Sequence, residues 1–97
     1  MLIIVSYDVA ISTEDGKKRL RHVAKICQKY GQRVQNSVFE CQIDSTQLAQ
    51  LKAELLQKID CEHDSLRFYS LGNRYDAHVE HYGVKDSLDL QKDTLLL

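Results

Sequence analysis

An aspartate at the end of an apolar strand is the residue whose type and place best suit metal chemistry. Asp8 follows the run Leu2-Ile3-Ile4-Val5 and lies beside Tyr7. A carboxylate at a strand end suits a hard cation such as Mg²⁺ or Mn²⁺, which prefers oxygen ligands. An aspartate there can instead cap a loop, and one carboxylate alone is a poor magnesium site. Two copies of Asp8 that meet across a dimer axis would make a better one.

A second candidate feature is a stretch of basic residues that contains no acidic residue. It lies between Gly16 and Gln35 and holds Lys17, Lys18, Arg19, Arg21, Lys25, Lys29 and Arg33. The whole chain has a formal net charge of −1 at pH 7, so this positive charge is local. Such a stretch favours contact with the phosphates of a polyanion. The alternative is a helix face whose lysines and arginines are simply solvated.

Arg33 and several aromatic residues are further candidates for nucleic-acid contact. An arginine in a strand needs either solvent or an anion, which favours a binding role for Arg33. Tyr30, Phe39 and Tyr69 are able to stack on bases, but packing in the core is the competing interpretation for each of them.

Metal and thiol chemistry elsewhere in the chain has weaker support. The segment His78-Val79-Glu80-His81 does not have the HExxH spacing of a zinc site, and no third ligand is evident. Cys27, Cys41 and Cys61 are odd in number and form neither a CxxC pair nor a disulfide framework. We therefore expect small core cysteines in a reduced, cytoplasmic protein.

The elements that position these residues follow from the hydrophobic pattern. A strand is expected over 2–9, apolar on both faces at its start, as in a strand that is covered on both sides. A helix is predicted over 17–30, after a cap at Ser12 or Thr13 and before a stop at Gly31. Its apolar stripe consists of Leu20, Val23, Ala24, Cys27 and Tyr30.

The second half of the chain repeats this alternation. A strand pair or one long bent strand is expected over 32–43, and Asn36-Ser37 is the one possible turn within it. A capping box at Asp44 and Gln47 predicts a second helix. Its apolar stripe consists of Leu48, Leu51, Leu55 and Ile59. Strands are expected over 65–71 and, with a weaker pattern, over 78–82.

This order predicts one α+β domain over 1–97, a ferredoxin-like β-α-β-β-α-β sandwich with a strand-like C-terminal extension over about 84–97. Both helices then cover one face of a four-stranded sheet. Because the first strand is apolar on both faces, we expect a homodimer whose partner sheet covers the open face. The apolar run over 2–5 is too short for a signal-peptide core or a membrane span.

Four segments of the chain resemble the family of small CRISPR-associated adaptation proteins, the "Cas-two" family. The segments are Tyr7-Asp8-Val9, Lys18-Arg19-Leu20-Arg21 through Tyr30-Gly31, Gly31-Gln32-Arg33-Val34-Gln35-Asn36-Ser37-Val38-Phe39-Glu40-Cys41, and Asp64-Ser65-Leu66-Arg67-Phe68-Tyr69. The third segment is the most specific. The chain looks most like the branch found in type I-C systems.

The resemblance implies a ferredoxin-like homodimer that acts as a metal-dependent endonuclease on RNA or duplex DNA. It also implies a scaffold role in spacer integration, beside dimers of the larger CRISPR integrase subunit. The family's metal-site aspartate falls on Asp8, and its other site residues fall on Tyr7, Arg33 and Phe39. Arg19 and Arg21 are candidates for the family's basic positions on the first helix, although His22 stands where other members have arginine.

Two function hypotheses therefore stand side by side. In the first, a magnesium-dependent phosphodiesterase uses Asp8 from both chains to hold the ion, and nearby arginines stabilise the developing charge. In the second, the basic residues hold duplex DNA or single-stranded RNA while the integrase performs the chemistry. One carboxylate per chain is sparse for a nuclease, whereas the basic stretch suits a phosphate grip. A purely regulatory ferredoxin-like module is a third, weaker hypothesis.

Overall fold

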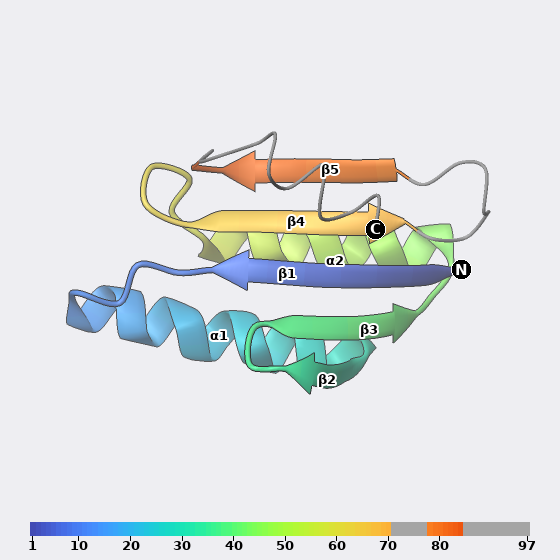
Figure 1. The fold of residues 1–97 in the computed structure, drawn as a ribbon, viewed down its shortest axis with the longest axis horizontal. Coiled ribbons are helices and arrows are strands. Elements are labelled where there is room, and N and C mark those ends of the chain that lie inside the picture. The colour runs from blue at the N-terminus through green and yellow to red at the C-terminus, as the bar shows by residue number, and fades with distance from the viewer. Residues whose placement is uncertain (71–77, 85–97) are drawn as a thin grey trace.

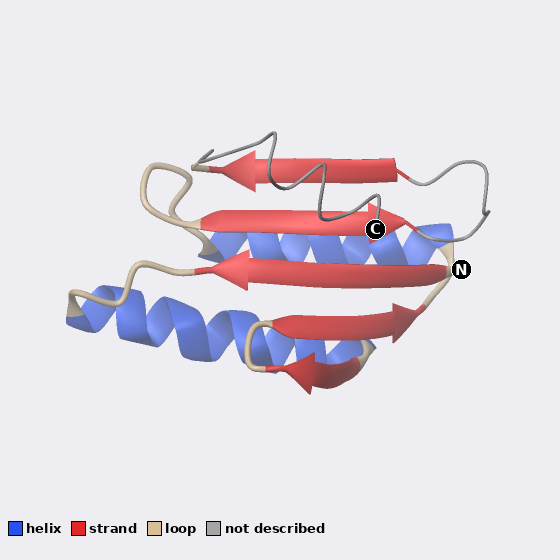
Figure 2. Cartoon of the chain, in the orientation of Figure 1, coloured by secondary structure: helices blue, strands red, loops and turns tan. Residues whose placement is uncertain are grey.

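The computed structural model describes residues 1–70 and 78–84, and within them five strands and two helices form two layers. The elements are β1 (Leu2–Asp8), α1 (Glu14–Tyr30), β2 (Gln32–Gln35), β3 (Val38–Gln42), α2 (Ser45–Lys58), β4 (Ser65–Ser70) and β5 (His78–Gly83). The strands form one antiparallel sheet in the order β2-β3-β1-β4-β5. Both helices lie on the same face of that sheet (Figures 1 and 2). This is the expected ferredoxin-like arrangement with one strand added at an edge.

The central strand β1 is buried on one face and half-covered on the other. Ile3, Val5 and Tyr7 alternate into the core beneath the helices, and each is at most 4% exposed. Leu2, Ile4 and Ser6 point to the open face and are half-buried. Both helices pack on the same side, as expected (Figure 1), and the cover of the second face by a partner sheet stays a prediction. We call the side away from the helices the open face.

The first helix has the expected cap but begins earlier than the apolar stripe suggested. The hydroxyl of Thr13 accepts a hydrogen bond from the backbone N–H of Gly16 at 3.0 Å. The helix then starts at Glu14 rather than Lys17, because acidic side chains in a first turn are favourable near the positive end of the helix dipole. Val23, Ile26 and Cys27 are its buried apolar residues.

The following hairpin and second helix match their predictions closely. β2 and β3 are joined by a turn at Asn36 and Ser37. Both hydrogen bonds of the capping box are present. The backbone N–H of Gln47 donates to Oδ1 of Asp44 at 2.7 Å, and the backbone N–H of Asp44 donates to Oε1 of Gln47 at 3.0 Å. Helix α2 buries Leu51 and Leu55 against the sheet, and Ile59 at its C-cap is also buried.

The segment over 78–82, which had the weaker strand pattern, forms an edge strand of the same sheet. β5 pairs with β4, and Tyr82 packs edge-on against Phe68 with ring centroids 6.1 Å apart. Glu80 of β5 forms an ion pair with Lys52 of α2, which ties the edge strand to the helix layer. The predicted C-terminal extension over about 84–97, which contains Leu88 and Leu90, lies outside the described residues except for Val84.

Candidate metal and nucleic-acid site

The carboxylate of Asp8 lies exposed at the end of β1, on the open face of the sheet. Alternation along the strand places Tyr7 toward the helices and Asp8 on the opposite side. Asp8 stands opposite Ser65 of β4 in the register of the sheet. Within the described parts of the chain, no hydrogen bond or ion pair occupies the Asp8 carboxylate. It is therefore available to a ligand that approaches the open face.

The other three candidate catalytic residues form a cluster on the helix side of the sheet. The Arg33 guanidinium lies over the Phe39 ring, 5.2 Å from its centroid, and Arg33 pairs with Phe39 across β2 and β3. The Tyr7 and Phe39 rings stack with centroids 6.2 Å apart. The hydroxyl of Tyr7 donates to the carbonyl of Asn36 at 3.4 Å. The sheet therefore separates this cluster from the Asp8 carboxylate.

Burial limits what the two aromatic members of this cluster are able to do. Phe39 is 0% exposed and Tyr7 is 4% exposed, which favours the core-packing interpretation of Phe39. Burial also raises the pKa of Tyr7, an effect that the neighbouring Cys27 reinforces and Arg33 opposes. Arg33 is the exposed member, so in this arrangement Phe39 acts on a ligand only through Arg33.

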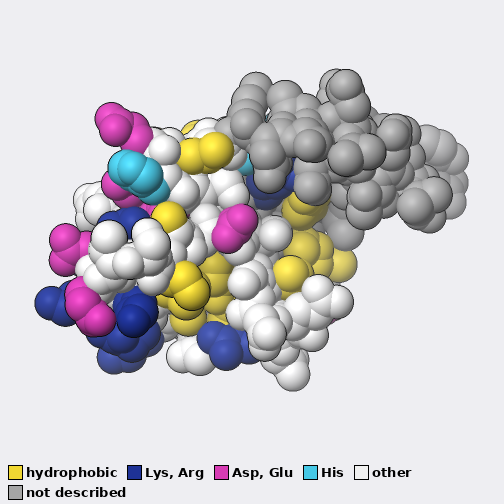
Figure 3. All heavy atoms as spheres, turned by 60° about the vertical axis from the view of Figure 1, so that its left-hand side comes forward, with side chains coloured by type: hydrophobic (Ala, Val, Ile, Leu, Met, Phe, Trp, Pro, Cys, Tyr) yellow, Lys and Arg dark blue, Asp and Glu magenta, His cyan; other side chains and the backbone are white. Residues whose placement is uncertain are grey.

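Several residues of the basic stretch have carboxylate partners that the sequence window does not contain. Lys29 forms an ion pair with Glu54 of α2, and Lys17 lies 3.5 Å from Glu14. Lys18 and Arg21 are exposed, and no ion pair involves them among the described residues. Figure 3 shows Lys and Arg side chains gathered at the lower left, over α1, with acidic side chains beside them. The positive surface is therefore smaller than the sequence window suggests.

Arg19 is the member of the stretch with the most buried partner. Its Nε donates to Oδ2 of Asp64 at 2.9 Å, and its Nη2 donates to Oδ1 at 3.3 Å. Asp64 is 0% exposed. Burial raises the pKa of the Asp64 carboxyl, but the bonds from Arg19 and from backbone N–H groups outweigh that effect and lower it. The predicted nucleic-acid role of Arg19 thus stays a prediction, and its observed role is to neutralise Asp64.

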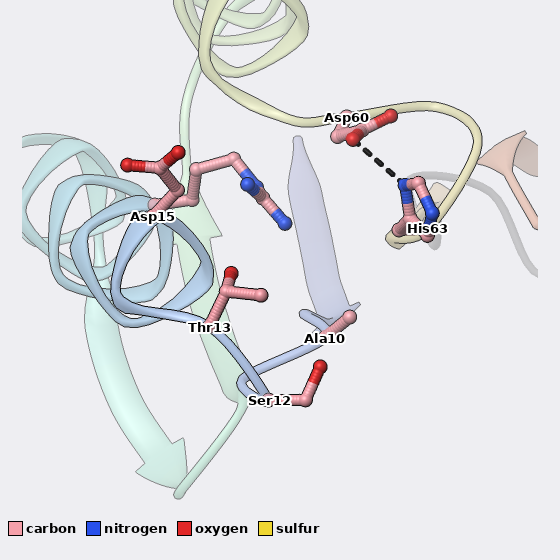
Figure 4. A pocket seen from close by; sticks show the side chains of 7 residues that line it. Ala10, Ser12, Thr13, Asp15, Asp60 and His63 are labelled. Carbon is pink, nitrogen blue, oxygen red and sulfur yellow. Dashed lines mark hydrogen bonds and ion pairs between the residues drawn. The ribbon is translucent and has the colours of Figure 1, made fainter.

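A pocket of about 300 Å³ lies beside this ion pair, between the loop after β1 and the loop before β4. Its lining consists of Ala10, Ser12, Thr13, Asp15, Arg19, Asp60 and His63. Figure 4 shows Asp60 and His63 on one side and the residues of the first loop on the other. Nδ1 of His63 lies 2.8 Å from Asp60, and this contact lowers the pKa of Asp60.

The histidines of β5 do not form a zinc site. Alternation along the strand sends His78 and His81 to opposite faces. His81 instead accepts a hydrogen bond from Nε of Arg67 at Nδ1, at 2.8 Å, on the open face. Within residues 1–70 and 78–84, no group of three histidine, cysteine or acidic side chains could hold a metal ion. The described residues therefore offer Asp8 no second and third side-chain ligand for a metal ion.

Two of the three cysteines have the predicted place in the core, and the prediction is wrong for Cys61, which lies in a loop. Cys27 and Cys41 are buried, while Cys61 is exposed in the loop before β4. Burial raises the pKa of the Cys27 thiol to about 12, so this thiol is not a nucleophile at neutral pH.

Sequence reasoning from single residues missed Asp64 and the pair of Arg67 and His81. Asp64 occupies a short polar connection, where nothing in the local pattern separates a buried carboxylate from a solvated one. Arg67 and His81 lie 14 positions apart and meet only because β4 and β5 pair. The one available signal for Arg67 was an arginine at the centre of an otherwise apolar strand.

These features define a class: a ferredoxin-like α+β protein with a free carboxylate at the end of its central strand and a basic first helix. No helix in the described residues has the length and apolar character that crossing a membrane requires. The family model for CRISPR associated protein Cas2 matches residues 1–79. The chain belongs to that family.

Close relatives agree with the family assignment over nearly the whole chain. A protein of Halalkalibacterium halodurans named CRISPR-associated endonuclease Cas2 is 63% identical over 91 residues, which cover 94% of this chain and 95% of the relative. A protein of Chlorobaculum tepidum named CRISPR-associated endoribonuclease Cas2 is 52% identical over 97 residues and covers both chains fully. The crystal structure of Streptococcus pyogenes Cas2 at pH 6.5 is similar with a TM-score of 0.70 and 56% identity, over 74% of this chain and 87% of that one.

Proposed function

We propose that this chain is a metal-dependent endonuclease of CRISPR adaptation, which acts as a homodimer and cleaves phosphodiester bonds. The carrying observation is the free, exposed carboxylate of Asp8 at the end of β1. Relatives that are 63% and 52% identical are named as an endonuclease and an endoribonuclease, which supports a nuclease activity for this chain. Because those two names differ, either duplex DNA or RNA remains the proposed substrate.

Asp8 fits a divalent ion only as half of a site. One carboxylate falls short of the several oxygen ligands that Mg²⁺ or Mn²⁺ takes, although water supplies some of them. A second Asp8, from a partner packed on the open face, would bring the protein ligands to two. When bound, the ion would supply positive charge at the phosphate that is hydrolysed. The dimer is therefore part of the proposed site.

The chain's own residues would then bind and orient the nucleic acid. Lys18 and Arg21 on α1 would hold backbone phosphates, because their side chains are exposed and no carboxylate neutralises them among the described residues. On the helix side of the sheet, away from Asp8, Arg33 would contribute a further guanidinium to this phosphate contact, held by its contact with Phe39. Tyr7 would help to hold Phe39, and through it Arg33, in place, since the Tyr7 ring stacks on the Phe39 ring.

A second candidate function is a scaffold that binds DNA while a larger integrase subunit performs spacer integration. The favouring observation is that Lys18 and Arg21 are exposed on α1, whereas Asp8 lies on the open face. A dimer formed through the open faces would leave both basic helices outward, able to hold one duplex. The two functions are compatible, and cleavage by the pure protein distinguishes them.

The experiment compares cleavage of labelled duplex DNA and single-stranded RNA by the wild type and by Asp8→Asn, with Mg²⁺, Mn²⁺ or EDTA. The proposal expects metal-dependent cleavage by the wild type and a loss of at least about 100-fold in the variant, while both proteins remain folded. Lys29→Gln, which removes a charge on α1 that is already paired with Glu54, is the control and should keep its cleavage. Equal rates for the wild type and Asp8→Asn would mean that another site or a contaminant performs the cleavage. The scaffold function would then have the stronger support.

A further inference from the structure

Asp64 gathers three separate segments at the end of the sheet where Asp8 lies. Its Oδ1 accepts from the backbone N–H of Ala10 at 3.0 Å, and its Oδ2 accepts from the backbone N–H of Asp60 at 2.9 Å. Arg19 of α1 donates two further bonds, at 2.9 and 3.3 Å. A fully buried carboxylate with four donors is rigid, because each of its oxygens is directed by two partners.

The backbone around Asp64 adds a fourth segment to this junction. The carbonyl of Asp64 accepts from the backbone N–H of Val84 at 2.8 Å, just after β5. Gly83 has a φ of 95°, and a Cβ atom there would lie 2.1 Å from the same carbonyl. The end of β5 can therefore lie against Asp64 only because residue 83 is a glycine.

Asp8 lies inside this junction, although its side chain does not touch Asp64. Ala10, which donates to Asp64, is two residues after Asp8 along the chain. Ser65, which follows Asp64, is the register partner of Asp8 across β1 and β4. The backbone on both sides of Asp8 is thus anchored, once through the loop that follows it and once through the neighbouring strand.

We propose that Asp64 is a positioning residue for Asp8, and that Arg19 acts through Asp64 rather than by contact with nucleic acid. This inference rests on the proposed function, in which Asp8 holds a divalent ion. An ion shared by two copies of Asp8 needs both carboxylates in a narrow range of positions. Asp64 and Arg19 supply that restraint for each copy. Groups bonded directly to a metal ligand change metal affinity by about 10–100-fold when they are lost, so a restraint that acts through the backbone should fall at the low end of that range.

The test measures Mn²⁺ affinity of the full-length protein by equilibrium titration, with the free energy of unfolding determined for every variant. Asp64→Asn keeps the shape of the side chain and removes its charge, and it should weaken Mn²⁺ binding about ten-fold. Glu54→Gln is the matched control, because it also removes a carboxylate from an ion pair between elements. It lies in the helix layer and should change the affinity less than about two-fold. Arg19→Lys retains the charge and should lose less affinity than Arg19→Gln.

A local readout separates positioning from general loss of stability. The amide of Ala10 should exchange its hydrogen faster in Asp64→Asn than in Glu54→Gln when the two are compared at equal stability. If Asp64→Asn fails to fold, Arg19→Gln provides the same comparison, since it leaves the two backbone bonds to Asp64 in place.

The outcomes distinguish this inference from the proposed function. Unchanged Mn²⁺ affinity in Asp64→Asn, or an equal loss in Glu54→Gln, overturns the positioning role and leaves the Asp8 site intact. A wild type whose Mn²⁺ binding is absent, or is the same as that of Asp8→Asn, refutes the proposed site, and the positioning role falls with it. A ten-fold loss of Mn²⁺ affinity in Asp64→Asn, with an affinity in Glu54→Gln close to that of the wild type, supports both the positioning role and the proposed function.

Discussion

At the scale of single residues, the buried carboxylate of Asp64 makes the stability of the protein depend on pH. Its pKa in the folded protein is below the ordinary value of 3.8, despite its burial, because Arg19 and two backbone N–H groups bind the charged form. A lowered folded pKa means that the unfolded chain binds this proton more tightly. The contribution of Asp64 is therefore complete above its ordinary pKa and is lost as the pH falls through the folded value.

Asp64→Asn should accordingly destabilise the protein by about 3 kcal/mol at pH 7, at the low end for a buried ion pair because Arg19 remains 21% exposed. The difference from wild type should narrow as the pH falls below 3.8, since the Asp64 carboxyl of the unfolded wild-type chain then binds a proton that the folded protein does not yet bind. Urea denaturation between pH 7 and pH 3 measures both quantities. A difference that stays constant over that range would mean that the Asp64 charge does not stabilise the fold.

At the scale of elements, α1 owes its close approach to the preceding loop to a glycine. Gly16 is buried in the first turn, and a Cβ atom there would lie 1.9 Å from the carbonyl oxygen of Ala10. Alanine ordinarily stabilises a helix by about 1 kcal/mol relative to glycine. Because the clash involves backbone atoms, it should outweigh that gain.

We therefore expect Gly16→Ala to destabilise the protein by about 1–3 kcal/mol, the range for overpacking. Gln28→Ala, at an exposed position of the same helix, should change the free energy of unfolding by no more than about 0.5 kcal/mol. Chemical denaturation of both variants provides the comparison. A more stable Gly16→Ala variant would show that the helix start is able to move away from Ala10.

The basic side chains of α1 form two groups, and only one of them should contribute to nucleic-acid binding. Each phosphate contact adds about −0.9 to the slope of log affinity against log salt for duplex DNA. Lys18→Gln with Arg21→Gln removes exposed charges that no carboxylate neutralises among the described residues. That variant should flatten the slope by up to about 0.9 for every contacting side chain.

The matched control for this measurement removes the same charge from ion-paired positions. Lys29→Gln with Lys52→Gln breaks the pairs with Glu54 and Glu80 and should leave the slope nearly unchanged. Fluorescence anisotropy over a range of salt concentrations gives both slopes. Equal flattening in the two double variants would show that net charge, rather than a defined surface, determines binding.

Local patterns predicted most elements of this fold, because their signals are short-range. The cap at Thr13, the capping box at Asp44 and the turn at Asn36 each depend on residues within three or four positions. The partners of Arg19 and Lys29 could not be predicted in this way. Arg19 meets Asp64 across 45 positions and Lys29 meets Glu54 across 25, so only the packed fold brings them together.

The same reasoning explains which parts of the site the sequence could predict. Asp8 was identifiable because a strand end is a local feature. Its separation from Tyr7, Arg33 and Phe39 was not identified, although strand alternation alone implies that Tyr7 and Asp8 face opposite sides. The burial of Phe39 follows from its position opposite Val5 at the centre of the sheet.

At the scale of the whole molecule, the two proposed activities lie on opposite sides of the sheet. Helix α1 carries Lys18 and Arg21, and the open face carries Asp8 together with half-buried Leu2 and Ile4. Packing of two open faces would bury these apolar side chains and bring two Asp8 carboxylates together. The paired charges would repel each other until a divalent ion binds between them.

The stoichiometry of Mn²⁺ binding tests this account most directly. Equilibrium titration, with the oligomeric state measured by sedimentation in the same buffer, should give one ion for every two chains of a homodimer. Asp8→Asn should remain a folded dimer and lose that ion, because a carboxylate at the end of β1 has no partner in the described chain to stabilise. A folded monomer, one ion for each chain, or undiminished binding by Asp8→Asn would contradict the account.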